Sequence, residues 1–172
     1  MHRLHLLRHA KSSWDDEVED SRRPLSKRGR QGARLIGETL PKAIGAVDLV
    51  LCSTALRARE TAELALAEYL PAPRVRFEGG LYLATPAMLL RRLGKLDEDC
   101  GAVMVVGHNP GLHELAVALA APGSRDCEAL AEGKFPTGVR ISFAIEGDWA
   151  RIGDARHKIL DYVTVKSLGG KE

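Results

Sequence analysis

Three short stretches of the sequence place basic side chains directly after an apolar run. The first, LLRHAKSSW, carries Arg8 and His9; the second, STALRARET, carries Arg57; the third, GHNPG, carries His108. Arginine presents a planar fork of N–H donors that matches phosphate oxygens, and an unprotonated imidazole is a nucleophile toward phosphorus. If these residues converge, they predict a receptor for a phosphoryl group.

The chemistry expected of these residues is phosphoryl transfer through His9. Positive charge on Arg8 and Arg57 would lower the pKa of the imidazole and keep one ring nitrogen unprotonated. Arginines can neutralise the phosphoryl oxygens without a metal, and His108 could hydrogen-bond the same oxygens before water hydrolyses the phosphohistidine. The sequence has no cluster of Asp and Glu with metal-ligand spacing, so neither a metal nor another cofactor is expected.

Alternating strand and helix patterns must hold these side chains in place. Short apolar runs predict strands at residues 4–7, 47–52, 75–77, 102–106 and 139–145. Helix signals cover residues 27–40, ended by Pro41, then 53 or 54 to 70, 86–96, 111–121 and 125–132. This alternation indicates βαβ units and hence an α/β fold, a three-layer α/β/α arrangement with a mainly parallel central sheet. Ligands bind at the carboxyl ends of such strands, where the basic stretches lie.

Two segments remain outside this alternation. Residues 139–152, with the EGDW turn, predict a hairpin that adds an antiparallel edge to the sheet. The loop over residues 11–24 is long and highly charged, so it is either a mobile surface loop or part of a site rim. Trp14, within this loop, could pack under it or line the rim. The role of the tail DYVTVKSLGGKE stays open.

Length, charge and cysteine content restrict the class of protein. At 172 residues with 45% hydrophobic content, the chain is long enough for one core, so a single domain over residues 1–172 is expected. The net charge of +2 singles out neither nucleic acid nor membrane as a partner. The 3 cysteines form no CxxC pair and no apolar segment is long enough for a signal or a membrane span, which favours a cytoplasmic protein.

The ordered motifs resemble those of the histidine phosphatase superfamily, also called the phosphoglycerate mutase-like family, and within it the compact SixA-type phosphohistidine phosphatases. The family's Arg-His-Gly signature is similar to Arg8-His9-Ala10, its arginine motif to STALRARETA, and its second histidine motif to VGHNP. RPLSKRGRQGA resembles the family's L-S/T-x-x-G helix opening. The likeness covers about residues 4–145 and implies a phosphoglycerate mutase-like fold with His9 as the phosphorylated nucleophile. The phosphate-binding residues that we expect are Arg8, Ser12, Arg57, His108 and Asn109.

The sequence departs from the family pattern at the general acid. Mutase-like members place a glutamate in a context resembling Leu-x-Glu, whereas Leu81-Tyr82-Leu83 stands here. Glu78 lies nearby but out of register, and Asp15 and Asp16 are the other candidates. The imidazole of a phosphohistidine can take its proton from water, while a more basic alkoxide benefits from an enzyme acid. The departure therefore favours phosphohistidine on a protein as the substrate.

Two alternatives stay open at this point. One is a small-molecule phosphomonoesterase of the same superfamily, which would act on a small phosphorylated metabolite with Glu78, Asp15 or Asp16 as the acid. The other is a non-catalytic module that binds phosphate without forming phospho-His9.

The remaining basic residues are expected to serve structure or solubility. His2, His5, His113 and His157 have no motif context, and Arg59, Arg91 and Arg92 suit solvated helix faces. A basic run is expected to be a solubilising surface, or else a docking face for an acidic partner or a second phosphate; its members are Arg22, Arg23, Lys27, Arg28 and Arg30.

Overall fold

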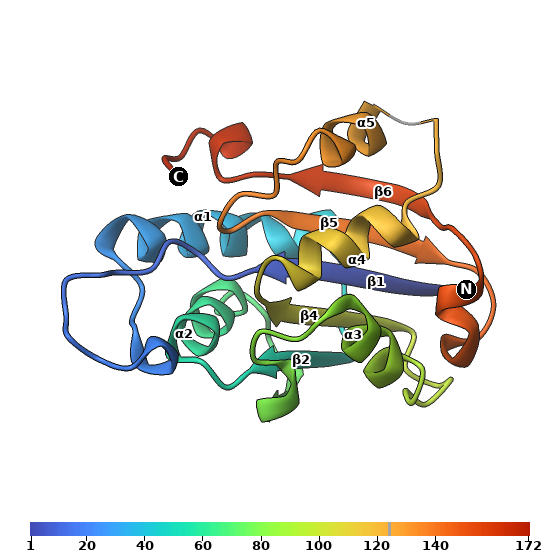
Figure 1. The fold of residues 1–172 in the computed structure, drawn as a ribbon, viewed down its shortest axis with the longest axis horizontal. Coiled ribbons are helices and arrows are strands. Elements are labelled where there is room, and N and C mark those ends of the chain that lie inside the picture. Colours follow the sequence, from blue (N-terminus) through green and yellow to red (C-terminus); the bar gives the residue numbers. More distant parts are fainter. Residues whose placement is uncertain (124) are drawn as a thin grey trace.

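A computed structural model of the chain shows a six-stranded sheet with helices packed on both of its faces (Figure 1). The structure describes residues 1–123 and 125–172. The strands are β1 (His2–Arg8), β2 (Leu49–Ser53), β3 (Arg74–Glu78), β4 (Ala102–Gly107), β5 (Arg140–Ile145) and β6 (Lys158–Val163). The helices are α1 (Lys27–Ile44), α2 (Leu56–Ala65), α3 (Pro86–Leu93), α4 (Gly111–Leu119) and α5 (Arg125–Ala131). Short 3-10 turns are η1 (Asp20–Arg22), η2 (Gly79–Leu81), η3 (Trp149–Asp154) and η4 (Lys166–Leu168).

The sheet has the strand order β3-β2-β4-β1-β5-β6. Strands β1 to β4 pair in parallel, while β5 runs antiparallel to β1 and β6 antiparallel to β5. The predicted three-layer α/β/α fold with a mainly parallel sheet is therefore confirmed. Because β1, β2 and β4 are parallel neighbours, their carboxyl ends meet at one edge of the sheet. Within the described residues, no helix combines the length and the apolar content needed to cross a bilayer.

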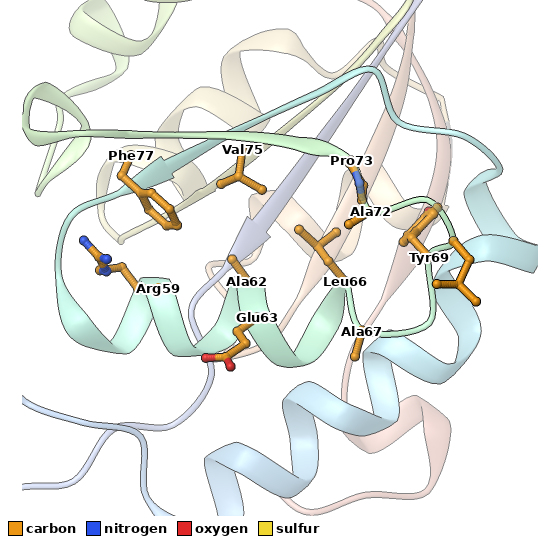
Figure 2. A pocket seen from close by; sticks show the side chains of 11 residues that line it. Arg59, Ala62, Glu63, Leu66, Ala67, Tyr69, Ala72, Pro73, Val75 and Phe77 are labelled. Atoms are coloured by element: carbon orange, nitrogen blue, oxygen red, sulfur yellow. The ribbon is translucent and has the colours of Figure 1, made fainter.

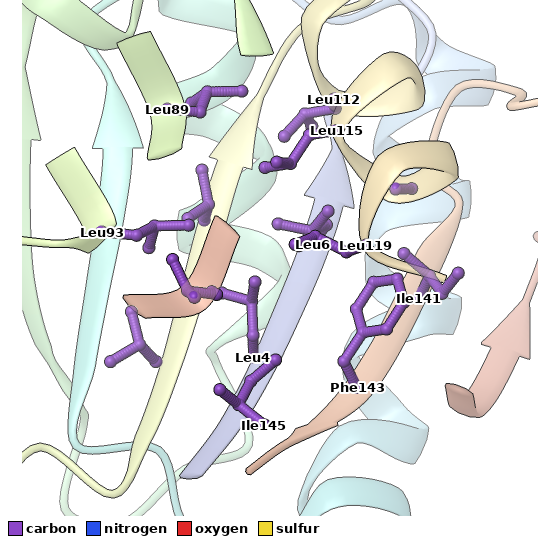
Figure 3. Packing of buried hydrophobic residues seen from close by; sticks show 14 of the residues in the cluster. Leu4, Leu6, Leu89, Leu93, Leu112, Leu115, Leu119, Ile141, Phe143 and Ile145 are labelled. Atoms are coloured by element: carbon purple, nitrogen blue, oxygen red, sulfur yellow. The ribbon is translucent and has the colours of Figure 1, made fainter. Parts of the chain in front are cut away.

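The apolar residues of the sheet divide between two cores. Along β1, Leu4 and Leu6 enter the core under α3 and α4, whereas Leu7 enters the core under α1 and α2. Figure 3 shows the first core, where the β1 side chains meet leucines of α3 and α4 and the apolar residues of β5. Strands β2, β4 and β5 are buried along their whole length. Each fully buried leucine contributes about 1.5–3 kcal/mol, so the strand ends that carry the basic residues are firmly held.

Helix α1 begins as predicted and ends later than predicted. The Ser26 hydroxyl accepts a hydrogen bond from the Gly29 amide at 3.0 Å, as an N-cap should. The helix does not stop before Pro41 but continues to Ile44. Pro41 lies in the last turn, where it removes only one main-chain hydrogen bond, and the buried side chains of Leu40 and Ile44 keep that turn packed on the sheet.

Helix α2 is shorter than predicted at both ends. It starts at Leu56, because Ser53 completes β2 and its hydroxyl accepts a hydrogen bond from the Ala55 amide at 3.2 Å. It ends at Ala65, well before the predicted end at Leu70. Leu70 is 95% exposed, so no apolar packing extends the helix that far.

The antiparallel edge is present, but its return strand comes from a later segment than predicted. The EGDW segment leads into η3, with Trp149 and Ile152 buried. The Trp149 indole N–H donates to the Cys100 carbonyl at 2.8 Å, which ties this turn to the body of the sheet. On the side away from β1, β5 pairs with β6, so part of the tail that the sequence left unexplained is a strand.

Candidate active site

The carboxyl ends of β1, β2 and β4 bring the predicted basic residues into one cavity. Arg8 ends β1 opposite Gly107, which ends β4, so His9 and His108 follow neighbouring strands. Their ring centroids are 5.2 Å apart. Arg57 is the second residue of α2, directly after β2. All four side chains line a cavity of about 460 Å³, together with Ser12 and Asn109.

His9 is held as a neutral imidazole with a defined tautomer. Its Nδ1 lies 2.8 Å from the main-chain carbonyl of Ala10. A carbonyl can only accept, so Nδ1 carries the proton and Nε2 keeps the lone pair. Burial, with smaller effects from His108 and the nearby arginines, lowers the pKa of His9 to about 3 although the Ala10 carbonyl opposes the shift. At pH 7 the ring is therefore uncharged and has a free nucleophilic nitrogen.

His108 is oriented by Ser53 from the end of β2. Its Nε2 lies 2.7 Å from the Ser53 hydroxyl, which also accepts the Ala55 amide N–H. Burial and then the charge of Arg57 lower the pKa of His108 to about 4. If the hydroxyl donates its proton to Nε2, the proton of the neutral ring is on Nδ1. Sequence reasoning missed Ser53 because its partner is 55 residues away along the chain.

The two arginines are anchored by different carbonyl groups. Arg8 donates from Nη1 to the Phe135 carbonyl at 2.9 Å, and the Asn109 amide donates to the same carbonyl at 3.0 Å. Asn109 therefore lines the cavity, but one N–H of its amide is already bound to the Phe135 carbonyl. Arg57 is 3% exposed and donates from Nη1 to the Asp20 carbonyl at 2.6 Å and from Nη2 to the Asp20 carboxylate at 3.0 Å.

The cavity side chains carry buried nitrogens without a partner in the described part of the chain. These atoms are Nε of Arg8, Nε of Arg57 and Nδ1 of His108. A buried polar group without a hydrogen bond costs about 1–3 kcal/mol. Burial and then the charge of Arg57 also lower the pKa of Arg8, because two guanidinium groups repel each other at short range. An anion in the cavity would relieve the repulsion between these two guanidinium groups.

Asp20 is a site residue that the sequence did not predict. It lies in η1, inside the charged loop, and accepts hydrogen bonds from Arg57, Arg23 and the Tyr82 hydroxyl. The Tyr82 hydroxyl, followed by the two arginines, holds the pKa of Asp20 well below its usual range. The loop over residues 11–24 is thus part of the site rim. The spacing of Asp20 and Arg23 suggests a local ion pair, but nothing in the sequence connects them with Arg57.

Arg23 does not belong to a solubilising surface, so this prediction is wrong. The residue is 7% exposed and lines the cavity. Its Nη1 donates to the Ser12 hydroxyl at 2.6 Å, and its guanidinium lies 3.5 Å from the centre of the Trp14 ring. Ser12 lines the same cavity, as expected, and its hydroxyl proton is available to another acceptor.

None of the three candidate acids of the small-molecule alternative lines the cavity. Glu78 accepts hydrogen bonds from Arg92 at 2.7 and 3.0 Å, and these bonds lower its pKa. Glu78 lines a separate hollow with Arg91 and Arg92, so it is not placed to act as an acid on a substrate bound beside His9. Arg92 is bound to Glu78 and is only partly exposed, so it is not the solvated residue that we expected. Asp15 and Asp16 are exposed and lie outside the cavity lining. The acids that the small-molecule alternative would need are therefore not found at the site: the described cavity lining contains no carboxyl group.

The other histidines have structural contacts outside the cavity. The ring of His5 lies 2.7 Å from the Ser142 hydroxyl, and that of His157 lies 2.8 Å from the Ile152 carbonyl. His2 contacts Glu98 and His113 contacts the Leu130 carbonyl. Their predicted placement away from the site is confirmed.

A second hollow, of about 530 Å³, lies between α2 and the edge strand β3 (Figure 2). Apolar side chains such as Leu66 and Val75 line most of it. Arg59 is exposed on α2, as expected, and its guanidinium lies 4.4 Å from the centre of the Phe77 ring at one end of this hollow. No predicted phosphate-binding residue reaches it.

Comparisons with known proteins agree with the fold. The sequence profile of the histidine phosphatase superfamily (branch 1) matches residues 4–78. An uncharacterised protein of Mycobacterium tuberculosis is 38% identical over 150 residues, covering 85% of this chain and 91% of its own. A structure from Nakamurella multipartitia, assigned as a phosphohistidine phosphatase SixA, has a TM-score of 0.82 at 28% identity and covers 94% and 95% of the two chains. A second, from Agrobacterium tumefaciens with the same assignment, has a TM-score of 0.79 at 25% identity over 95% and 97%.

Proposed function

Since the chain belongs to the histidine phosphatase superfamily and has its SixA-type fold, we propose that it removes phosphate from phosphohistidine on a protein, through a phospho-His9 intermediate and without a metal. The observation that carries the proposal is the neutral His9 in one cavity with the partly buried Arg8 and the buried Arg57, whose Nε atoms have no partner among the described residues. A nucleophile and an anion receptor in one cavity are the two requirements of this chemistry.

In the first step, Nε2 of His9 attacks the phosphorus. The bond from phosphorus to the substrate imidazole breaks, its electron pair stays on the imidazole nitrogen, and solvent supplies the proton. Arg8 and Arg57 neutralise the phosphoryl oxygens, while Nδ1–H of His108 donates to one of them. Arginines in these roles replace the charge that a metal would supply.

In the second step, water attacks the phosphorus of phospho-His9. The bond from phosphorus to Nε2 breaks, His9 recovers its lone pair, and the proton lost by water passes to phosphate or solvent. The products are inorganic phosphate and the neutral enzyme, so the catalytic cycle closes without another reactant.

The absence of a carboxyl group in the described cavity lining supports phosphohistidine as the substrate class. The nearest carboxylate is Asp20, which its partners hold ionised and which therefore cannot donate a proton at pH 7. An imidazole leaving group needs less help than the alkoxide of a sugar phosphate. The assignments of the Nakamurella and Agrobacterium structures support the same substrate class.

The test compares a histidine-phosphorylated protein with sugar phosphates and aryl phosphates, each with and without EDTA. We expect kcat/KM to be at least about 100-fold higher for phosphohistidine than for sugar phosphates, since an unassisted alkoxide costs several powers of ten. EDTA should change neither rate. A clear preference for sugar phosphates would instead identify a small-molecule phosphomonoesterase. Phosphate binding without turnover would identify a binding module.

A further inference from the structure

Two large apolar side chains stand exposed around the cavity that contains His9. Trp14 is 77% exposed and Leu83 is 51% exposed, yet both line this cavity. The other large lining side chains are polar or charged, and His9 is 6% exposed. Trp14 belongs to the loop before η1, and Leu83 to the segment between η2 and α3. Two separate elements therefore bring an apolar group to the open side of a phosphate-binding cavity.

Trp14 is an exposed ring with a fixed orientation. The guanidinium of Arg23 lies 3.5 Å from the ring centre and covers one face. Arg23 is itself held by Asp20 at 3.0 Å and by the Ser12 hydroxyl at 2.6 Å. Because one face is covered and the residue is still largely exposed, the other face of the indole is open. A cation over one face also favours an indole that stays in place without burial.

Leu83 is held outward by an unusual backbone conformation. Its φ angle is 50°, in the left-handed region that side chains with a Cβ rarely adopt. Its neighbours explain how this conformation is maintained: the Tyr82 hydroxyl is bound to Asp20, and Ala84 is buried. A strained position that exposes leucine beside a cavity calls for a functional explanation.

The direction of phosphoryl transfer supplies that explanation. The attacking atom and the leaving group lie on opposite sides of phosphorus. Since His9 is buried on the floor of the cavity, the leaving group must point toward the solvent side, where Trp14 and Leu83 are. Resting on the function proposed above, we propose that Trp14 and Leu83 form the leaving-group subsite: the open face of the indole stacks on the substrate imidazole, and Leu83 packs against the same side chain.

The test uses the full chain and two probes that differ in the leaving group. One probe is N-phosphoimidazole, whose leaving group is a ring; the other is phosphoramidate, whose leaving group is ammonia. We expect Trp14→Ala to raise KM for N-phosphoimidazole about tenfold, from the size of ring-stacking effects, and to change kcat/KM for phosphoramidate less than about twofold. Trp14→Phe should restore most of the lost affinity. Leu83→Ala should act in the same direction with a smaller effect.

The matched control is Leu70→Ala, which removes a leucine that is 95% exposed beside the hollow of Figure 2. This substitution should leave KM and kcat/KM unchanged for both probes. If Trp14→Ala lowers kcat/KM equally for both probes, Trp14 only supports Arg23, and the subsite is refuted. The subsite is also refuted if Trp14→Ala changes the kinetic constants of neither probe. If the unsubstituted protein hydrolyses neither probe, the failure lies in the proposed function itself.

Discussion

The imidazole rings of His9 and His108 lie 5.2 Å apart in a cavity that Arg8 and Arg57 also line, and burial lowers the pKa of each ring far enough to keep it neutral at pH 7. The positive charge of the cavity therefore comes from its other basic side chains, Lys11, Arg8, Arg23 and Arg57, and the arginines stay charged at any physiological pH. The imidazoles are left free to supply a lone pair and an N–H group. The charged side chains thus give the cavity an anion receptor, and the neutral imidazole of His9 gives it a nucleophile.

Replacement of His9 by alanine should remove turnover and leave the fold intact. Only the Nε2 lone pair of His9 can form the covalent intermediate, so we expect kcat/KM to fall by about 1000-fold or more. Quenched reactions with a labelled phosphohistidine protein should contain acid-labile enzyme-bound phosphate in the unsubstituted protein and none in His9→Ala. His2→Ala, at the other end of β1, is the control and should retain activity. Undiminished hydrolysis by His9→Ala would show that another group is the nucleophile.

The pH dependence of kcat/KM should lack a limb at the usual imidazole pKa of 6.5. The active form of each ring is unprotonated, and the values of about 3 for His9 and about 4 for His108 mean that protonation begins only well below neutrality. We therefore expect a plateau from about pH 8 down to about pH 5 and a decline as pH falls toward 4. The measurement requires an acid-stable aryl phosphate, correction for its own ionisation, and circular dichroism at each pH. A half-loss of activity near pH 6.5 would contradict the burial argument.

Much of the fold and the catalytic core could be predicted from the sequence because the information is local. Each basic stretch directly follows an apolar run, and parallel pairing of β1 with β4 then brings His9 and His108 together. The alternation of strands and helices was sufficient to place Arg57 at the same edge. Element ends were less predictable: α1 passes through Pro41 because Leu40 and Ile44 pack on the sheet.

The supporting residues could not be predicted because their partners are distant in sequence. Asp20 binds Arg57 across 37 positions, and Ser53 binds His108 across 55. An aspartate in a charged loop and a serine at a strand end have many ordinary explanations, and only the folded chain selects among them. Arg23 was misjudged for the same reason: a run of basic residues looks solvent-exposed until one of them is found beneath Trp14.

Ser53→Ala should disturb the protonation of His108. Without the hydrogen bond that the Ser53 hydroxyl donates to Nε2, the neutral ring can carry its proton on either nitrogen. Fewer molecules then present Nδ1–H to the phosphoryl group. We expect kcat/KM to fall about tenfold, corresponding to about 1.4 kcal/mol for one oriented hydrogen bond. Nitrogen NMR of labelled histidine should show mainly the Nδ1–H tautomer before substitution and a mixture after it. An unchanged tautomer spectrum would remove this role from Ser53.

Asp20→Asn should weaken the orientation of Arg57 and Arg23. The side chain of Asp20 is 44% exposed, so solvent screens the lost charge and we expect only a fivefold to tenfold drop in kcat/KM, or about 1 kcal/mol. The control is Asp154→Asn, which removes an exposed partner of Arg151 at 3.2 Å and should have no effect. A gain in phosphate affinity would mean that the Asp20 carboxylate competes with phosphate for Arg57.

Glu78→Gln separates the phosphohistidine assignment from a reaction that needs an enzyme acid. Glu78 pairs with Arg92 in a separate hollow, and the hydrogen bonds from Arg92 lower its pKa, so it is ionised at pH 7 and has no proton to give. We expect kcat for phosphohistidine and for an aryl phosphate to stay within about twofold of the unsubstituted value, while loss of the partly exposed ion pair lowers the free energy of unfolding by up to about 1 kcal/mol. Stopped-flow turnover and urea denaturation on the same preparations measure both quantities. A loss of kcat that grows as the leaving group becomes more basic would restore Glu78 as a general acid and would favour a small phosphomonoester as the substrate.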